Sequence, residues 1–361
     1  MKNKPNQTQF MVSKVEPLVV SKVEPLVVSK VEPPVVSLSN PPVVRSSNLL
    51  QTLAEPPKQR MVGHSFCKTA VLGSNPTIGC VNLQRKYNSL QKALKKLRRV
   101  IVAYSGGVDS TFLLKVAVDT LGPENVLACI AKGPSLPAAQ YRKALSIAKK
   151  IGVAIQAIEQ TEFDDQWYLA NKADRCFYCK SHLFEILTSI AKEKKFNYVI
   201  CGHNFDDLKD YRPGNKAAEK YSIRSPLMEA KLTKEDIRQL SRQLGLPTAD
   251  IPASPCLASR IIYGLQITQQ RLNQIEKAED FLKKFGLIEF RVRHHDQIAR
   301  IEVHPQDFEK ITTEPARSKI IKKLKSLGFK YITIDLQGFR SGSLNELLTK
   351  NEKRNVGNKK P

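Results

Sequence analysis

The feature that most constrains the fold is the string SGGVDS at residues 105–110, which lies between two apolar segments. Val100 to Ala103, just before it, is a short apolar run of the kind typical of a buried strand. Thr111 to Leu121, just after it, places apolar side chains at helical spacing. The sequence therefore predicts a strand, a tight glycine turn and a helix in succession. This arrangement can bind phosphate groups at the helix N-terminus.

The residues of this loop suit a nucleotide. Gly106 and Gly107 permit a positive φ and a close backbone approach, and Ser105 and Ser110 add hydroxyl donors. No lysine follows in the frame of a Walker A loop. The string instead resembles the loop of the PP-loop ATP pyrophosphatases, which cut ATP between the α and β phosphates. The resemblance implies that ATP meets Ser105, Gly106, Gly107, Asp109 and Ser110.

The segments that follow alternate between predicted strands and helices. Strands are predicted at 126–130, 154–158 and 198–201, and helices at 138–151 and 182–194. This alternation predicts an α/β domain with a parallel sheet covered by helices, as in the adenine nucleotide alpha hydrolase-like fold of PP-loop proteins. Ligands of such sheets sit at the carboxyl ends of the strands. We therefore expect the loops that begin at residues 105, 132, 159 and 202 to share one edge, which adds Gly202 to the ATP site.

The chain divides into four predicted parts. Residues 1–88 contain an eight-residue repeat, SKVEPLVV, with a proline in each unit, and are predicted to be a disordered extension. Residues 89–250 form the PP-loop domain. Residues 251–347, with a long helix, two paired strands, further helices and a last strand, form a smaller α+β C-terminal domain. Residues 348–361 are predicted to be a disordered tail.

The cysteines indicate a compartment and a candidate site. The count of seven is odd and no secretory segment is recognisable, so we expect reduced thiols and a cytoplasmic protein. The sequence contains no run of about 18 apolar residues, so no membrane span is predicted. Cys176 and Cys179 form a C-x-x-C, and Cys256 lies in a separate Pro-Cys-Leu-Ala-Ser-Arg turn. The C-x-x-C alone fits zinc, redox or iron–sulfur roles. Three cysteines fit a [4Fe–4S] cluster with one open iron, and the alternative is three free thiols.

The charged residues indicate an acidic partner. The net charge is +24, although part of the excess lies in the two terminal regions, where solvated tails explain it equally well. Arg291 and Arg293 alternate along a predicted strand and would share one face. Such a face is usually only solvated, but guanidinium groups also match carboxylates and phosphates. Arg260, four residues after Cys256, is a further candidate, and so is Glu279 on the long helix.

Beyond the loop, several segments resemble the LarE family of sulfur transferases, in the order in which that family has them. The resemblance covers residues 90–347. Its segments are VAYSGGVDSTFLLKVA, ADRCFYCKSHLFEIL, GHNFDDLKDYRPG, SPLMEAKLTKEDIR, SPCLASRI and DLQGFRSGSLNE.

The resemblance implies an ATP- and Mg²⁺-dependent sulfurtransferase. Its substrate would be a small anionic nucleotide, pyridinium-3,5-biscarboxylic acid mononucleotide, whose carboxylate is adenylated and then converted to a thiocarboxylate. AMP and pyrophosphate would be released. Asp109 would orient the loop or help to hold the metal, and Arg260, Arg291, Arg293 and Glu279 would bind the substrate.

Family members differ in their source of sulfur, and both routes stay open here. In one route the sulfur of Cys256 is given up and the residue becomes dehydroalanine. In the other, Cys176, Cys179 and Cys256 hold a [4Fe–4S] cluster that presents a transferable sulfide, so a sulfide or another sulfur donor is an expected partner. The presence of the C-x-x-C favours the cluster type. The family also forms larger assemblies, which makes a homo-oligomer an expectation.

Two other functions fit part of these observations. A PP-loop tRNA thiolase also combines the loop, an adenylate and sometimes three cysteines, and the basic charge suits tRNA. The absence of zinc-ribbon cysteine sets and of an added RNA-binding module argues against a nucleic-acid partner. A non-catalytic, ATP-responsive iron–sulfur protein is the third hypothesis, and substrate-dependent release of pyrophosphate separates it from an enzyme.

Overall fold

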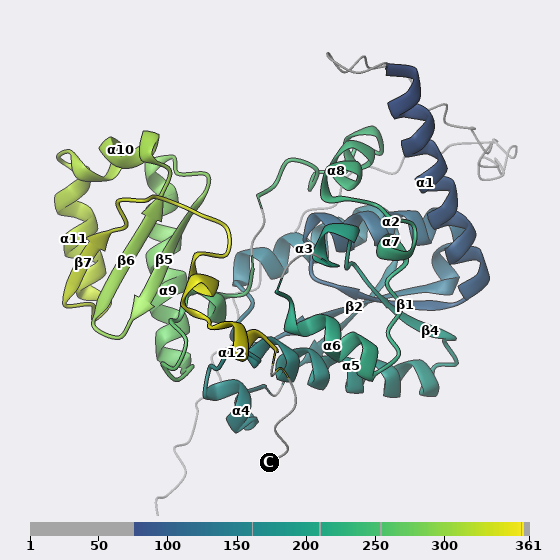
Figure 1. The fold of residues 1–361 in the computed structure, drawn as a ribbon, viewed down its shortest axis with the longest axis horizontal. Helices are drawn as coiled ribbons and strands as arrows, with labels where there is room; N and C mark the ends of the chain where they lie inside the picture. Colours follow the sequence, from purple (N-terminus) through teal and green to yellow (C-terminus); the bar gives the residue numbers. More distant parts are fainter. Residues whose placement is uncertain (1–75, 161, 209–210, 253–254, 355, 357–361) are drawn as a thin grey trace, which may run out of the picture. The chain divides into compact units, whose positions relative to one another are not determined.

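The computed structural model describes residues 76–160, 162–208, 211–252, 255–354 and 356 (Figure 1). All of them belong to one compact unit. The repeats, Cys67 and the last five residues lie outside the described residues.

The first sheet has four parallel strands in the order β3-β2-β1-β4 (Figure 1). Their bounds are β1 Val100–Tyr104, β2 Val126–Lys132, β3 Ala154–Glu159 and β4 Tyr198–Cys201. The central strands are almost wholly apolar because helices cover both faces of the sheet. Cys129 and Cys201 are buried core residues, as expected for cysteines within strands. The prediction of a parallel α/β sheet is confirmed.

Helices form a layer on each face of this sheet. On one face the core joins α1 (Pro76–Leu97), α2 (Val108–Leu121), α3 (Ala138–Ile151), α7 (Pro226–Glu229) and α8 (Lys234–Gln243). On the other face it joins α5 (Arg175–Glu193) and α6 (Pro213–Lys220). The helix α1 begins thirteen residues before the predicted start at 89, because Leu83 and Tyr87 continue its buried face.

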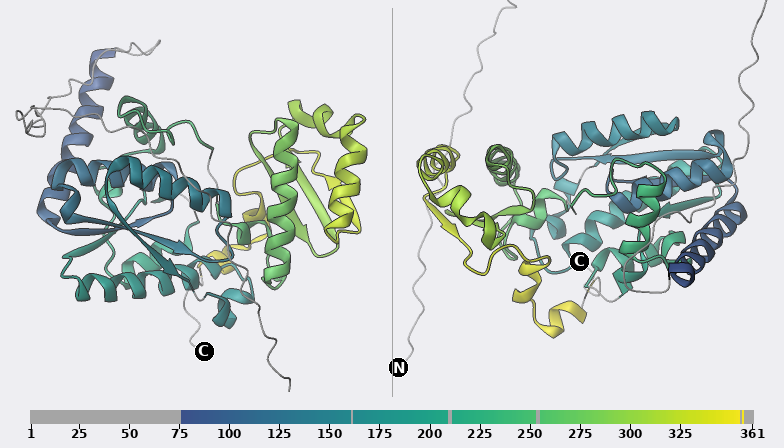
Figure 2. Two further views of the ribbon diagram at one scale, coloured as in Figure 1. Left: turned by 180° about the vertical axis from the view of Figure 1, so that it is seen from behind. Right: turned by 90° about the horizontal axis from the view of Figure 1, so that it is seen from above.

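The second sheet belongs to the C-terminal residues and has the order β5-β6-β7. Strands β5 (Phe290–His295) and β6 (Ile298–Val303) are antiparallel, and β7 (Tyr331–Ile334) joins β6 in parallel. The connection between β6 and β7 contains α10 (Phe308–Thr312) and α11 (Ala316–Ser326). The helices α11 and α9 (Gln269–Leu282) lie side by side over the same face of the sheet (Figure 2), and one apolar core joins them to it. This is the α+β module predicted from the sequence.

Residues 348–354 and 356, which belong to the segment predicted to be a disordered tail, are described by the structure. A short helix, α12 (Lys350–Arg354), follows, and Leu348 and Val356 are buried on either side of it. The Nζ atom of Lys216, in α6, donates a hydrogen bond to the carbonyl of Val356. The charged residues of this segment led to the prediction of a disordered tail. Burial of Leu348 and Val356 instead stabilises the segment against the rest of the protein. No helix among the described residues is long and apolar enough to cross a membrane.

Candidate active site

The glycine loop lies between β1 and α2; Gly106 has a positive φ, whereas Gly107 has φ −76°. Gly106 has φ +73°, and a Cβ added there would lie 2.6 Å from the Cβ of Ala144. Gly107 occupies the N-cap of α2, where its carbonyl accepts a hydrogen bond from the N–H of Thr111. A larger side chain at 106 would have to displace α3. The loop therefore needs a glycine at 106 both for its dihedral angle and for space.

The other predicted ATP residues gather around this turn. The Oγ atoms of Ser105 and Ser110 lie 3.1 Å apart, and that of Ser110 donates to the carbonyl of Gly107. A Cβ on Gly202, at the end of β4, would lie 2.9 Å from the backbone nitrogen of Ser110. The end of β4 thus packs directly on the first turn of α2. Hydroxyls and backbone N–H groups meet at a helix N-terminus, which is a favourable place for phosphate.

Asp109 has a basic partner that is distant in sequence. Its carboxylate forms an ion pair with the Nζ of Lys234, the first residue of α8, and accepts a hydrogen bond from the amide of Asn204. The start of α8 is fixed by the predicted capping box of Thr233 and Asp236. Lys234 is not among the site residues predicted from the sequence. The capping box marks the start of α8, whose first residue is Lys234 and whose N-terminus contacts the loop after β4. It is the sequence signal that could have placed Lys234 near the glycine loop.

The C-x-x-C lies in the first turn of a helix rather than in a loop. The helix α5 begins at Arg175, seven residues before the predicted start at His182. Cys176 and Cys179, three residues apart, therefore share one face of the helix near its positive end. The side chain of Gln160, after β3, donates to the carbonyl of Cys179 and lies 3.3 Å from its Sγ.

The three thiols of the predicted site are neighbours. Burial raises the pKa of Cys179 to about 12, and the charges of Glu162, Cys256 and Cys176 add to that shift. Burial and Cys176 likewise raise the pKa of Cys256, while the guanidinium of Arg175 lowers it. Cys179 and Cys256 also pack against one apolar cluster. The structure thus brings together residues that are far apart in the sequence.

The three thiols are donors of the type that an iron–sulfur cluster needs, but their sulfur atoms are not arranged to hold one. None of these three cysteines forms a disulfide bond among the described residues, so their sulfurs are available as ligands. Within the described ranges, no group of three or more His, Cys, Asp or Glu residues stands close enough to hold a metal ion. Three adjoining thiolates are nevertheless the donor set that such a cluster uses. The three residues are of the right type for such a cluster, but the described positions of their sulfurs do not form a metal site.

The thiol site adjoins the edge of the first sheet. The N–H of Leu257, directly after Cys256, donates to the carbonyl of Ser135 in the loop after β2 at 2.8 Å. The hydroxyl of Ser135 in turn donates to the buried carboxyl of Glu162, whose pKa burial raises. Glu162 is not among the residues predicted from the sequence, since an acidic residue after a strand is not by itself unusual. The loops after β2, β3 and β4 therefore adjoin the nucleotide loop or the thiol site at one edge of the sheet, as the parallel topology predicts.

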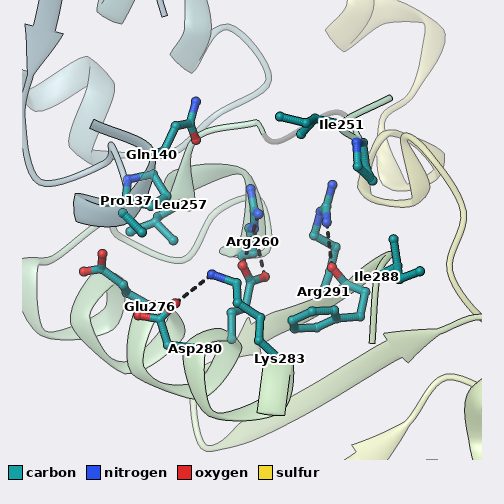
Figure 3. Close-up of a pocket in the computed structure, with 14 residues that line it drawn as sticks. Pro137, Gln140, Ile251, Leu257, Arg260, Glu276, Asp280, Lys283, Ile288 and Arg291 are labelled. Carbon is teal, nitrogen blue, oxygen red and sulfur yellow. Dashed lines mark hydrogen bonds and ion pairs between the residues drawn. The ribbon is translucent and has the colours of Figure 1, made fainter. Parts of the chain in front are cut away.

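A cavity of about 220 Å³ lies beside the turn of Cys256 (Figure 3). Arg260, Glu279 and Arg291 line it, together with Gln140 of α3. Arg260 is only 2% exposed, and its Nε and Nη2 atoms donate to the two oxygens of Glu279 at 3.0 and 3.1 Å. Its Nη1 donates to the carbonyls of Pro255 and Cys256. The pair therefore forms one wall of the cavity and holds the cysteine turn in place.

The two strand arginines differ in their surroundings. Arg291 lines the cavity, and burial together with the charge of Arg260 lowers its pKa to about 10. Arg293 is buried and bound to the carboxylate of Glu302, which is itself fully buried, with further hydrogen bonds to the carbonyl of Ser259 and the hydroxyl of Ser343. Arg291 therefore stands where a ligand of the cavity would meet it. Arg293 links β5 to the Cys256 turn and to the C-terminal segment.

Comparison with known proteins identifies the family. The family model described as NAD synthase matches residues 82–174, which include the glycine loop. An uncharacterized protein of Synechocystis sp. is 41% identical over 74% of this chain and 100% of its own length. The pyridinium-3,5-bisthiocarboxylic acid mononucleotide synthase of Lactiplantibacillus plantarum is 38% identical over 74% of this chain and 96% of its own length. The chain belongs to the LarE family.

A more distant similarity extends to another class of PP-loop protein. The tRNA-specific 2-thiouridylase of Thermoanaerobacter sp. is 25% identical over 52% of this chain and 62% of its own length. Membership of the LarE family confirms the fold predicted from the loop and makes this chain an ATP-dependent sulfurtransferase. The candidate site has three parts: the glycine loop, the thiols, and the arginine-lined cavity.

Proposed function

We propose that this enzyme converts a carboxylate of pyridinium-3,5-biscarboxylic acid mononucleotide to a thiocarboxylate at the expense of ATP. The observation that most supports the proposal is the position of the Cys256 turn. Its backbone bonds to the loop after β2, beside the glycine loop, in a chain 38% identical to the synthase named for the bisthiocarboxylic product. Activation and sulfur delivery would then take place at one edge of the sheet.

The first step would be adenylation. A carboxylate oxygen of the substrate attacks the α phosphorus of ATP, the bond to the bridging oxygen of the β phosphate breaks, and pyrophosphate leaves with the electron pair. The N–H groups of the glycine loop and the hydroxyls of Ser105 and Ser110 would bind the phosphates. Asp109 would hold Mg²⁺, which neutralises the departing charge, and Lys234 would exchange its carboxylate partner for a phosphate oxygen.

The second step would replace AMP by sulfur. When hydrosulfide attacks the acyl carbon, a C–S bond forms, the C–O bond to AMP breaks with its electron pair, and the proton of hydrosulfide passes to water. When Cys256 is the donor, its thiolate attacks in the same way. Loss of the Cα proton then breaks the Cβ–S bond and leaves dehydroalanine. A cluster held by Cys176, Cys179 and Cys256 would supply the sulfide of the first route.

The cavity residues would bind the substrate. Arg291 faces the cavity and would bind an anionic group of the mononucleotide. Arg260, held by Glu279, would position Cys256 and contribute positive charge near the reacting carboxylate. Arg293 would orient the strand and the Ser259 backbone rather than reach the ligand. A cytoplasmic location and a homo-oligomeric state stay predictions.

Exchange of labelled pyrophosphate into ATP tests the activation step. The pyridinium dicarboxylate mononucleotide should support exchange in the wild type and in Cys256→Ala, because adenylation needs no sulfur. The wild type and the matched control Cys129→Ala, which removes a core thiol of β2, should then form thiocarboxylate, and Cys256→Ala should not. Absence of substrate-dependent exchange in the wild type would show that the proposed substrate is wrong.

The second candidate is a tRNA thiolase, which the 25% identity to a 2-thiouridylase and the positive net charge favour. The same assay separates the two. A tRNA thiolase would exchange pyrophosphate with tRNA present, would bind tRNA with a steep dependence on salt, and would ignore the mononucleotide.

A further inference from the structure

Arg175, at the start of α5, is a buried cation with no carboxylate partner within the described part of the chain; the ionisable groups beside it include the thiol of Cys176, to which it is hydrogen-bonded, and the thiol of Cys256. The side chain is only 4% exposed, yet no described carboxylate forms an ion pair with it. The Nη1 atom donates to two neutral oxygens, those of the Asn171 side chain and the Ala258 backbone. The ring of Tyr263 lies 5.2 Å from the guanidinium carbon. Burying a charge is costly and no carboxylate offsets it here, so the site favours an anion beside the thiols.

Hydrogen bonds to Asn171 and Ala258 fix the position of the Arg175 guanidinium. The amide nitrogen of Asn171 donates to the carbonyls of Ile262 and Leu265, both at 2.8 Å. These bonds turn the Asn171 oxygen towards Arg175 and tie the arginine to the segment that follows Cys256. The Nε atom of Arg175 is buried and has no hydrogen-bond partner in the described structure. One donor of a rigidly held cation is thus left for a ligand.

The surroundings indicate what kind of anion would fit. Arg175 precedes Cys176 directly, and its charge acts on the thiol of Cys256. Tyr168 and Leu257 line the same region and are almost fully buried. A strongly hydrated oxyanion such as phosphate would lose its water shell among thiols and apolar side chains. A small, polarisable sulfur anion loses less and lies where the sulfur must be delivered.

We propose that Arg175 is the binding residue for an inorganic sulfur anion of the hydrosulfide class, which it holds beside Cys176 and Cys256 before transfer. This inference rests on the proposed function, since it assigns the place where the sulfur enters. It treats Arg175 as a residue that binds and positions the sulfur donor, with no part in the activation of the carboxylate.

The binding test follows the thermal unfolding of the metal-free protein under anaerobic conditions with a chelator. Sodium sulfide is compared with sodium chloride at equal concentration. A ligand that binds only the folded state raises the melting temperature, and the expected rise for the wild type is at least about 2 °C in sulfide relative to chloride. Arg175→Met should show no rise. Lys172→Met removes a cation from an exposed position three residues earlier and should behave like the wild type.

The kinetic test separates this role from a structural one. Arg175→Met should raise the KM for sulfide at least about tenfold, while pyrophosphate exchange with the pyridinium substrate stays unchanged. Arg175→Lys keeps the charge and should recover part of the sulfide affinity, which also covers the case in which the methionine variant folds poorly.

Several results would overturn the inference. They are an equal stabilisation of Arg175→Met by sulfide, no stabilisation of the wild type, or equal stabilisation of the wild type by chloride. An unchanged KM for sulfide in both Arg175 variants would also do so. If the wild type shows no pyrophosphate exchange, the proposed function fails, and the thermal comparison still decides whether Arg175 binds the anion.

Discussion

Replacing Glu279 with alanine should destabilise the protein strongly, because it isolates a buried guanidinium. Glu279 supplies both oxygens to Arg260, which is 2% exposed, and also accepts a hydrogen bond from the N–H of Val292. Removing one partner of a buried ion pair costs about 3–5 kcal/mol, since the remaining charge stays desolvated. The expected loss of unfolding free energy is therefore of that size. Urea denaturation followed by circular dichroism measures it.

The matched control lies one residue further along α9. Asp280 pairs with Lys283 at 2.7 Å, but both side chains are more than half exposed, so Asp280→Ala should cost about 1 kcal/mol or less. Arg260 also holds the carbonyls of Pro255 and Cys256, so Glu279→Ala should slow sulfur transfer more than pyrophosphate exchange. If the two variants were equally stable, the interpretation of Arg260 and Glu279 as one buried unit would be wrong.

Three further predictions concern other parts of the protein. Gly106→Ala should abolish ATP binding in calorimetry while the fold persists, because the added Cβ meets that of Ala144 at 2.6 Å; unchanged affinity would contradict the loop geometry. Lys234→Met should weaken ATP binding at least about tenfold, and a loss of affinity no larger than twofold would show that its ion pair with Asp109 is only structural. Burial and the charge of Arg271 lower the pKa of His294 to about 4, from 6.5. The unfolded state therefore binds the proton first, stability is lost as pH falls from 6.5 towards 4, and His294→Gln should remove about 3 kcal/mol of that loss in urea titrations; an unaltered pH profile would refute it.

Local patterns predicted the elements that position the nucleotide loop. The apolar run before Ser105 and the helical spacing after Ser110 placed β1 and α2, and the Thr233–Asp236 capping box placed the start of α8. Each of these depends on neighbouring residues, so one stretch of sequence contains the whole signal. The common edge of the strand-end loops followed from parallel topology alone.

The pairings within the site could not be predicted in the same way. Asp109 and Lys234 are 125 residues apart, and no local pattern indicates which of many lysines reaches the loop. Substrate binding by Arg293 stays a prediction; the ion pair of its side chain with Glu302 depends on strand register and burial, which no local pattern shows. The start of α5 at Arg175 was missed because a C-x-x-C with two aromatic residues gives no helical periodicity of its own.

The central claim is that the protein adenylates a carboxylate and then replaces its activated oxygen with sulfur. The most direct test incubates the enzyme with ATP, Mg²⁺, the pyridinium dicarboxylate mononucleotide and isotopically labelled sulfide, and follows AMP, pyrophosphate and product by mass spectrometry. We predict one AMP and one pyrophosphate for each thiocarboxylate formed. Labelled product with Cys256 intact indicates the sulfide route, and unlabelled product with Cys256 converted to dehydroalanine indicates the sacrificial route. Release of ADP, or AMP without any sulfur-containing product, would contradict the account.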